Sequence, residues 1–204
     1  MKGGEILKKI IVGFVAILFV AAAFAATNAN AEATYIGAKK CKACHMKQFK
    51  SWQKTTMADS FENLKPGAKA EAKTKAGLEA DKDYTHDESC VKCHSTGYGK
   101  PGGFTTIEET PQLAGVQCEG CHGPGSEYSA VMKKKQKEWK KTGYTSEELK
   151  AIGLTIPSED EAGCMACHGG DSPFTEKVDA KYKFDFKDRL EKTHKHYPLK
   201  YKKD

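Results

Sequence analysis

Apolar side chains recur along this chain at the spacing of a helix. Between residues 46 and 64, the large apolar positions gather on about one half of a helical surface: Phe49, Trp52, Met57, Phe61 and Leu64. Pro66 and Gly67 then end the segment. No run alternates apolar and polar residues convincingly enough to indicate a strand. The pattern predicts a mainly α protein with long loops.

The rest of the chain is predicted to alternate short helices with loops. Residues 68–84 are rich in Ala, Lys and Glu without an apolar stripe, which predicts an exposed helical insertion. Residues 95–111 contain several glycines and prolines, so we expect a loop there. Ser126 is a candidate N-cap for a helix that reaches Lys141. The sequence Thr145-x-x-Glu148 has the form of a capping box and predicts a further short helix.

The amino terminus has the features of an export signal. Lys2, Lys8 and Lys9 precede an apolar run over residues 10–26, and residues 29–31 (Ala-Asn-Ala) offer a small-residue cleavage site. The alternative is a retained membrane anchor, because a run of about 17 residues is near the lower limit for a span. The cleavage site favours removal. We therefore expect residues 1–31 to be a signal peptide and residues 32–204 to be one periplasmic domain with no membrane span.

Composition indicates that side chains alone form only a thin core. Charged residues make up 29% of the chain and aromatic residues 9%. The formal net charge is +6, and loss of three lysines and one glutamate with the signal peptide lowers it to +4. Lysine runs over residues 133–141 and 200–203 suit docking on an acidic partner, or are ordinary solvated faces. Nothing indicates nucleic-acid binding.

Every cysteine of the chain falls in one of four Cys-x-x-Cys-His cassettes. The cassettes are Cys41–Cys44–His45, Cys90–Cys93–His94, Cys118–Cys121–His122 and Cys164–Cys167–His168. This spacing is typical of covalent c-type haem attachment, in which both thiols form thioethers with the porphyrin and the histidine binds the iron. The sequence therefore predicts four haem c groups, which would supply the apolar centres that the composition lacks.

Three other uses of paired cysteines fit less well. A zinc site does not require a histidine in the same place after every pair. Disulfides across two-residue loops are cramped and leave the histidines unexplained. A thioredoxin-like motif occurs singly within a βαβ pattern, and the chain has no such pattern.

The remaining histidines cannot complete the coordination of four irons. Only His86, His194 and His196 stand outside the cassettes, so at least one iron uses another distal ligand or is five-coordinate. Methionine is the usual substitute and raises the reduction potential. Met57 and Met132 are the candidate methionines, although simple core packing would also explain both.

Several segments, taken in order, resemble the cytochrome c-554 family. They are Tyr35-Ile36-Gly37 before the first cassette, Trp52 with Met57-Ala58, Ser95-Thr96-Gly97-Tyr98 after the second cassette, and the stretch from Gly115 to Ser126 around the third. The resemblance covers nearly all of residues 32–204 apart from residues 68–84. It implies a mainly α-helical tetrahaem electron carrier with closely packed haem pairs.

The resemblance also implies roles for residues outside the cassettes. In the family, the position of Met57 carries a histidine that binds the fourth haem. The helix after the third cassette supplies the distal ligand of the first haem, and here it offers Tyr128 and Met132. A histidine near the carboxyl terminus serves the third haem, which points to His194 or His196. The second haem is five-coordinate. This chain lacks the family's histidine at two places, the position of Met57 and the helix that carries Met132. The resemblance therefore favours Met57 and Met132 as iron ligands and points away from the family's low potentials.

We expect a periplasmic electron-transfer protein. Electrons would enter from a dehydrogenase or another cytochrome, pass through four haems, and leave to a terminal reductase or a further cytochrome. One alternative is a haem enzyme that reduces a small nitrogen oxide or peroxide at a five-coordinate haem, with Tyr98, Lys100 or His86 as donors. Another is a subunit of an extracellular cytochrome filament. For His86 itself, a surface position is expected.

Overall fold

Helices are the regular elements of this protein. The computed structural model describes residues 32–157 and 161–204, so the predicted signal peptide lies outside the described residues. Two isolated bridges, Ser95 with Ala114 and Tyr144 with Lys202, take the place of strands in these ranges. No helix in the same ranges is both long enough and apolar enough to cross a membrane. The prediction of a mainly α protein is confirmed.

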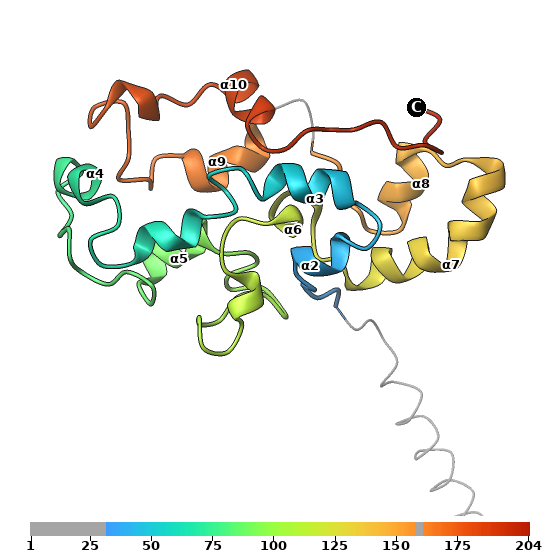
Figure 1. Cartoon of the computed structure of the whole chain (residues 1–204), viewed down its shortest axis with the longest axis horizontal. Coiled ribbons are helices and arrows are strands. Elements are labelled where there is room, and N and C mark those ends of the chain that lie inside the picture. The colour runs from blue at the N-terminus through green and yellow to red at the C-terminus, as the bar shows by residue number, and fades with distance from the viewer. Residues whose placement is uncertain (1–31, 158–160) are drawn as a thin grey trace, which may run out of the picture. The chain divides into compact units, whose positions relative to one another are not determined.

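The helices are short and are joined by long turns (Figure 1). In chain order the α-helices are α2 (Ala38–Cys41), α3 (Met46–Trp52), α4 (Ala70–Lys75), α5 (Glu88–His94), α6 (Cys118–His122), α7 (Ser126–Thr142), α8 (Ser146–Ala151), α9 (Ala162–His168) and α10 (Phe186–Glu191). The 3₁₀ helices are η2 (Ser60–Leu64), η3 (Pro111–Leu113) and η4 (Ala180–Tyr182). All of them except α7, which has 17 residues, are too short to be stable alone, so tertiary contacts must hold them.

The prediction of a single helix between residues 46 and 64 is wrong. α3 ends at Trp52, and the chain turns before η2 resumes the helical path. In the turn, the Met57 carbonyl accepts a hydrogen bond from the distant Val116 amide at 3.1 Å. Such tertiary bonds replace the local bonds of a continuous helix, and the apolar period of the sequence cannot reveal them.

The exposed helix expected over residues 68–84 forms only in part. α4 covers six residues, and Lys73 within it is 3% exposed. Lys73 Nζ donates to the Lys65 carbonyl at 2.7 Å and lies 5.2 Å from the centre of the Tyr84 ring. The aliphatic stem packs inward while the carbonyl and the ring satisfy the charge. This segment is therefore attached to the core rather than fully solvated.

The helices after the third cassette follow their sequence signals, with one correction. α7 begins at Ser126, but Gly125 is its N-cap. The Ser126 hydroxyl oxygen instead accepts a bond from the Thr34 amide at 2.9 Å. The capping box before α8 is confirmed, because the side chains of Thr145 and Glu148 each bond to the other's backbone amide.

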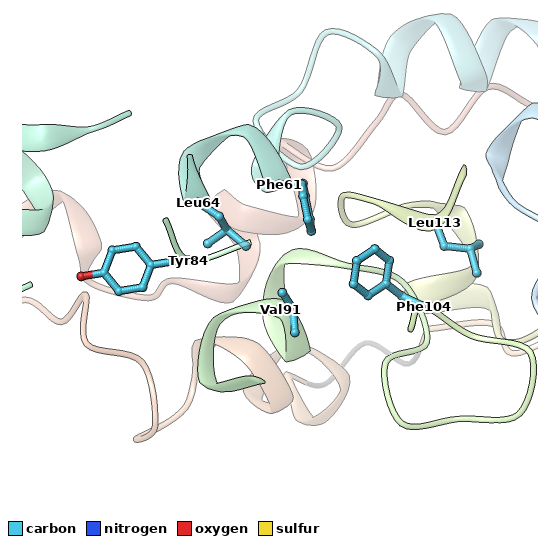
Figure 2. Close-up of a cluster of buried hydrophobic side chains, with 6 residues drawn as sticks. All are labelled: Phe61, Leu64, Tyr84, Val91, Phe104 and Leu113. Carbon is cyan, nitrogen blue, oxygen red and sulfur yellow. The ribbon is translucent and has the colours of Figure 1, made fainter. Parts of the chain in front are cut away.

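A small apolar cluster packs around α5 (Figure 2). It consists of Phe61, Leu64, Tyr84, Val91, Phe104 and Leu113. Phe104 comes from the predicted loop, is 2% exposed, and has its ring centre 5.4 Å from that of Phe61. Among the described residues after Leu149, no hydrophobic side chain is buried. The side-chain core is thin, as the composition predicts, and it supports the region of the second cassette.

Truncation within this cluster should destabilise the protein. Phe104→Ala removes a buried ring, so we expect the free energy of unfolding of the haem-loaded protein to fall by about 3–5 kcal/mol. Denaturant titration followed by far-UV circular dichroism measures the change. Leu190→Ala is the control, because this side chain is 38% exposed, and it should cost about 0.5 kcal/mol or less. Equal losses for the two variants would contradict this location of the core.

Candidate haem-binding site

Each Cys-x-x-Cys-His cassette is built on about one helical turn. The second, third and fourth cassettes lie within α5, α6 and α9, and each of these helices ends at the cassette histidine. α2 ends earlier, at Cys41, yet the His45 amide still donates to the Cys41 carbonyl at 2.9 Å. Residues three and four apart lie on one face of a helix. The two thiols and the imidazole of a cassette therefore share a face.

The cassettes meet in pairs. α2 packs against α6 and α5 packs against α9, so the first cassette adjoins the third and the second adjoins the fourth (Figure 1). The Cys41 thiol is hydrogen-bonded to Cys118. Burial, followed by the charge of Cys93, raises the pKa of Cys167 to about 12. The structure places none of the eight cysteines in a disulfide bond, so it lends no support to the disulfide alternative.

Two cassette histidines are fixed by backbone carbonyls. The His94 Nδ1 donates to the Ser60 carbonyl at 2.6 Å, and the His122 Nδ1 donates to the Thr155 carbonyl at 3.0 Å. Because a carbonyl oxygen only accepts, these rings carry their proton on Nδ1 and keep a lone pair on Nε2. Burial lowers the pKa of both rings. This favours the neutral form that binds a metal.

The other two cassette histidines are also kept neutral by their surroundings. Burial lowers the pKa of His45, and the neighbouring His122 ring adds to this effect. Burial likewise lowers the pKa of His168. The His168 ring stacks on Phe184 with ring centres 5.0 Å apart. All four cassettes thus present an imidazole suited to metal binding.

Arg189, a residue that sequence reasoning missed, braces the fourth cassette. Its Nη2 donates to the carbonyls of Lys181 at 2.9 Å and Lys183 at 3.3 Å, immediately before Phe184. Burial is the main cause of the lowered pKa of His168, and the charge of Arg189 adds to it. A signal was present, because Arg189 is the only arginine among 33 basic residues. A guanidinium fork can hold two acceptors at once, which a lysine does less well.

The carboxyl-terminal histidines approach the third cassette. The His194 ring centre lies 6.4 Å from that of His122, and the His196 ring centre lies 4.2 Å from that of His194. Two imidazoles that bind one metal ion from opposite sides have ring centres about 6 Å apart, because each metal–nitrogen bond is about 2 Å. The spacing of His122 and His194 therefore suits a haem iron, and the donor set of the third cassette fits this cofactor.

The candidate methionines lie in different surroundings. Met132 is half-buried on α7, one turn after Tyr128. Burial and then the nearby Cys41 raise the pKa of Tyr128, so this face of α7 lies beside the first cassette. Met57 is half-buried in the turn after α3. Its carbonyl accepts from the Val116 amide, so the Met57 backbone lies against the segment that leads into the third cassette.

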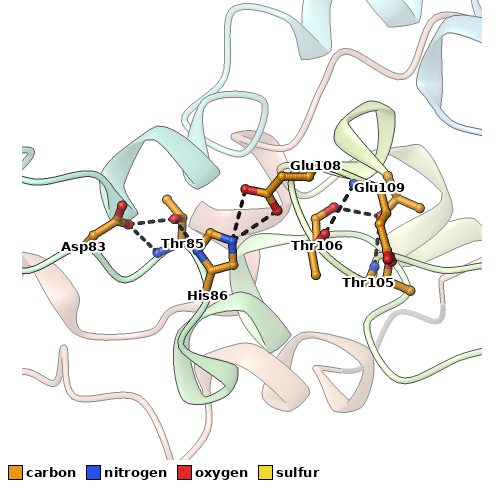
Figure 3. Close-up of polar contacts among 8 residues, drawn as sticks. Asp83, Thr85, His86, Thr105, Thr106, Glu108 and Glu109 are labelled. Carbon is orange, nitrogen blue, oxygen red and sulfur yellow. Dashed lines mark hydrogen bonds and ion pairs between the residues drawn. The ribbon is translucent and has the colours of Figure 1, made fainter.

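His86 lies at the surface, as expected. Its Nε2 contacts Glu108 Oε2 at 3.1 Å, and its side chain is 58% exposed. Its Nδ1 lies 3.1 Å from the Thr85 hydroxyl, which is itself bonded to Asp83 (Figure 3). His86 therefore belongs to a surface polar network.

Glu119 is a second residue whose role sequence reasoning missed. It lies inside the third cassette and is 1% exposed. Its carboxylate accepts hydrogen bonds from the amides of Ile36 at 2.9 Å, Gly37 at 2.7 Å and Gly125 at 2.7 Å. The only signal in the sequence was an acidic residue between the two cysteines of a cassette. Glu119 thus ties the segment before the first cassette, and the start of α7, to the third cassette.

Paired cassettes, neutral histidines and a helical frame define a multihaem c-type cytochrome. The family described as "Cytochrome c554 and c-prime" matches residues 40–123. Cytochrome c-554 of Nitrosomonas europaea is 39% identical over 202 residues, which cover 89% of this chain and 85% of that protein. The solved reduced state of cytochrome c554 from Nitrosomonas europaea matches with a TM-score of 0.76 at 39% identity, over 85% of this chain and 91% of that chain. This chain therefore belongs to the cytochrome c-554 family and is a tetrahaem electron carrier.

Filling the space at Gly125 should disturb the Glu119 contacts. A Cβ at Gly125 would lie 2.8 Å from Glu119 Oε1 and 3.1 Å from the Ile36 side chain. We expect Gly125→Ala to lower the free energy of unfolding by about 1–3 kcal/mol. Gly120→Ala, inside the third cassette, is the matched control, because its Cβ would meet only Val116 Cγ1, at 3.6 Å. Thermal unfolding of the haem-loaded variants measures both changes. A loss in both, or in neither, would contradict the close contact at Gly125.

Proposed function

We propose that this cytochrome transfers electrons between redox proteins of the periplasm through haems held by its four cassettes. The pairing of the cassettes carries the proposal, since α2 packs against α6 and α5 packs against α9. Cys121 of the third cassette also lies close enough to Cys164 of the fourth for the charge of Cys164 to raise its pKa. Neighbouring cassettes therefore form a chain in the order first, third, fourth, second. Each bound haem c supplies one reversible one-electron site. The similarity to cytochrome c-554 gives no support to an extracellular filament.

In this proposal the protein supplies attachment, orientation and tuning. The thioether positions are Cys41, Cys44, Cys90, Cys93, Cys118, Cys121, Cys164 and Cys167, and the proximal ligands are His45, His94, His122 and His168. The Nδ1-protonated rings would present Nε2 to the iron. His194 is favoured over His196 as the distal ligand at the third cassette, because the 6.4 Å between the ring centres of His194 and His122 suits an iron held between the two rings. Met132 and Met57 are the proposed distal ligands of the first and fourth haems.

The two carboxyl-terminal histidines can be told apart by spin state. His194→Ala should create an additional high-spin haem in the oxidised protein, because the iron loses one of its two axial nitrogen ligands. His196→Ala is the matched control and should leave the low-temperature EPR spectrum unchanged. A high-spin signal from His196→Ala alone would reverse the assignment.

The same measurement tests the methionines. Met57→Ala and Met132→Ala should each alter the signal of one haem. Unchanged spectra would exclude methionine ligation.

A hollow lined by lysines lies beside the carboxyl-terminal histidines. Its volume is about 360 Å³, and its lining is Lys47, Lys50, Ser51, Lys54, Lys195 and Tyr197. The Lys195 amide donates to the Ser51 hydroxyl oxygen at 2.8 Å, which joins the segment after His194 to α3. None of the four lysines forms an ion pair within the described ranges. Their charges suit an acidic surface on a redox partner, close to the third cassette.

Electron exchange through this hollow should depend on charge. With an acidic blue-copper protein as acceptor, we expect the stopped-flow rate of oxidation of the reduced protein to fall about tenfold from low to high salt. At low salt, a triple change to Glu at Lys47, Lys50 and Lys54 should have a similar effect.

The same triple change at positions 133, 134 and 137 of α7 is the charge-matched control. A larger effect there would move docking to the lysine run over residues 133–141. The absence of electron transfer to the acceptor would overturn the proposed function.

A further inference from the structure

Glu119 is a buried carboxylate at the junction of two cassettes. Its two oxygens accept hydrogen bonds from three backbone amides, those of Ile36, Gly37 and Gly125. All three contacts are N–H donors, so both oxygens of the Glu119 side chain act as acceptors. No cationic side chain in the described part of the chain forms an ion pair with Glu119. The negative charge is therefore fixed and not neutralised by a partner.

The charge of Glu119 reaches both cassettes of one pair. Glu119 follows Cys118, whose thiol is hydrogen-bonded to Cys41 of the first cassette. The surroundings respond to this charge, because it adds to burial in raising the pKa of Tyr35 and Tyr128. In a poorly polarisable interior such an interaction is stronger than in water and is screened little by salt.

The other pair of cassettes has a charge of the opposite sign nearby. The Arg189 guanidinium lies close to the fourth cassette, where the neighbouring Phe184 ring stacks on His168. Arg189 is held there by two carbonyls, so its position is also fixed. The first and third cassettes thus lie beside a buried anion, and the fourth lies beside a cation.

We propose that the Glu119 carboxylate lowers the reduction potentials of the haems at the first and third cassettes. The proposal rests on the proposed function, because it requires haem at these cassettes. A nearby negative charge stabilises the oxidised, more positive iron, so it lowers the potential.

A purely structural role for Glu119 makes a different prediction. Its three amide bonds fasten residues 36, 37 and 125 to the third cassette, and this would suffice to explain its burial. A structural role requires the hydrogen bonds, whereas the tuning role requires the charge. Two variants separate these roles: Glu119→Gln keeps the length and one acceptor oxygen but removes the charge, and Glu119→Asp keeps the charge but shortens the reach.

The test is a spectroelectrochemical titration of the haem-loaded protein. In Glu119→Gln, two of the four reduction potentials should rise, each by about 59 mV. For a one-electron couple, this corresponds to a tenfold change in the equilibrium constant for electron exchange. The other two should stay in place. Glu119→Asp should unfold at a lower temperature yet keep potentials near those of the unmodified protein. Glu127→Gln, at an exposed position in the first turn of α7, is the control and should change neither property.

Several outcomes would overturn the proposal. One is a folded Glu119→Gln protein whose four potentials equal those of the unmodified protein. Another is a Glu119→Asp protein whose potentials shift as far as those of Glu119→Gln. If Glu119→Gln does not assemble, Glu119→Asp decides, and a shift of its potentials without loss of the charge would reject the proposal. A haem content below four per chain would count against the proposed function instead.

Discussion

Holding the cassette histidines neutral and correctly rotated is the requirement on which this structure depends. A buried imidazole N–H needs an acceptor, and the carbonyls of Ser60 and Thr155 supply one for His94 and His122. Ser60 reaches that position because the chain leaves the helix after Trp52 and turns before η2. The broken helix is thus part of the arrangement that leaves Nε2 free for iron. The long loops have the same purpose, since they bring distant carbonyls to the cassettes.

Different forces support the two pairs of cassettes. An apolar cluster that includes Phe104 and Leu113 packs around α5 and the second cassette. The first and third cassettes are joined by buried polar side chains instead. The Glu119 carboxylate accepts a hydrogen bond from the Gly37 amide at 2.7 Å, and the Gln117 side-chain oxygen accepts one from the Ala38 amide at 2.7 Å. Hydrogen bonds of this kind add little net stability, but removing one partner leaves a buried donor unsatisfied. They therefore determine where the cassettes lie more than how stable the protein is.

Charge acts at two depths in this cytochrome. Fixed charges near the cassettes, the Glu119 carboxylate and the Arg189 guanidinium, are held by backbone groups. Exposed lysines, such as those on α3, face solvent and line the hollow beside the carboxyl-terminal histidines. Salt screens exposed charges and affects buried ones much less. In the proposed function, docking and internal electron flow can therefore be adjusted separately.

The sequence by itself determined the cofactor, the four attachment sites, the mainly α class and the capping box at Thr145, because each depends on residues a few positions apart. Only the tertiary structure decided how the cassettes pair, that the His194 ring centre lies 6.4 Å from that of His122, and where the helix over residues 46–64 breaks. These features depend on contacts between residues tens of positions apart, such as the bond from the Ile36 amide to Glu119. The local period of a sequence carries no record of such contacts, so the pattern that predicts a helix could not reveal which distant groups would end it.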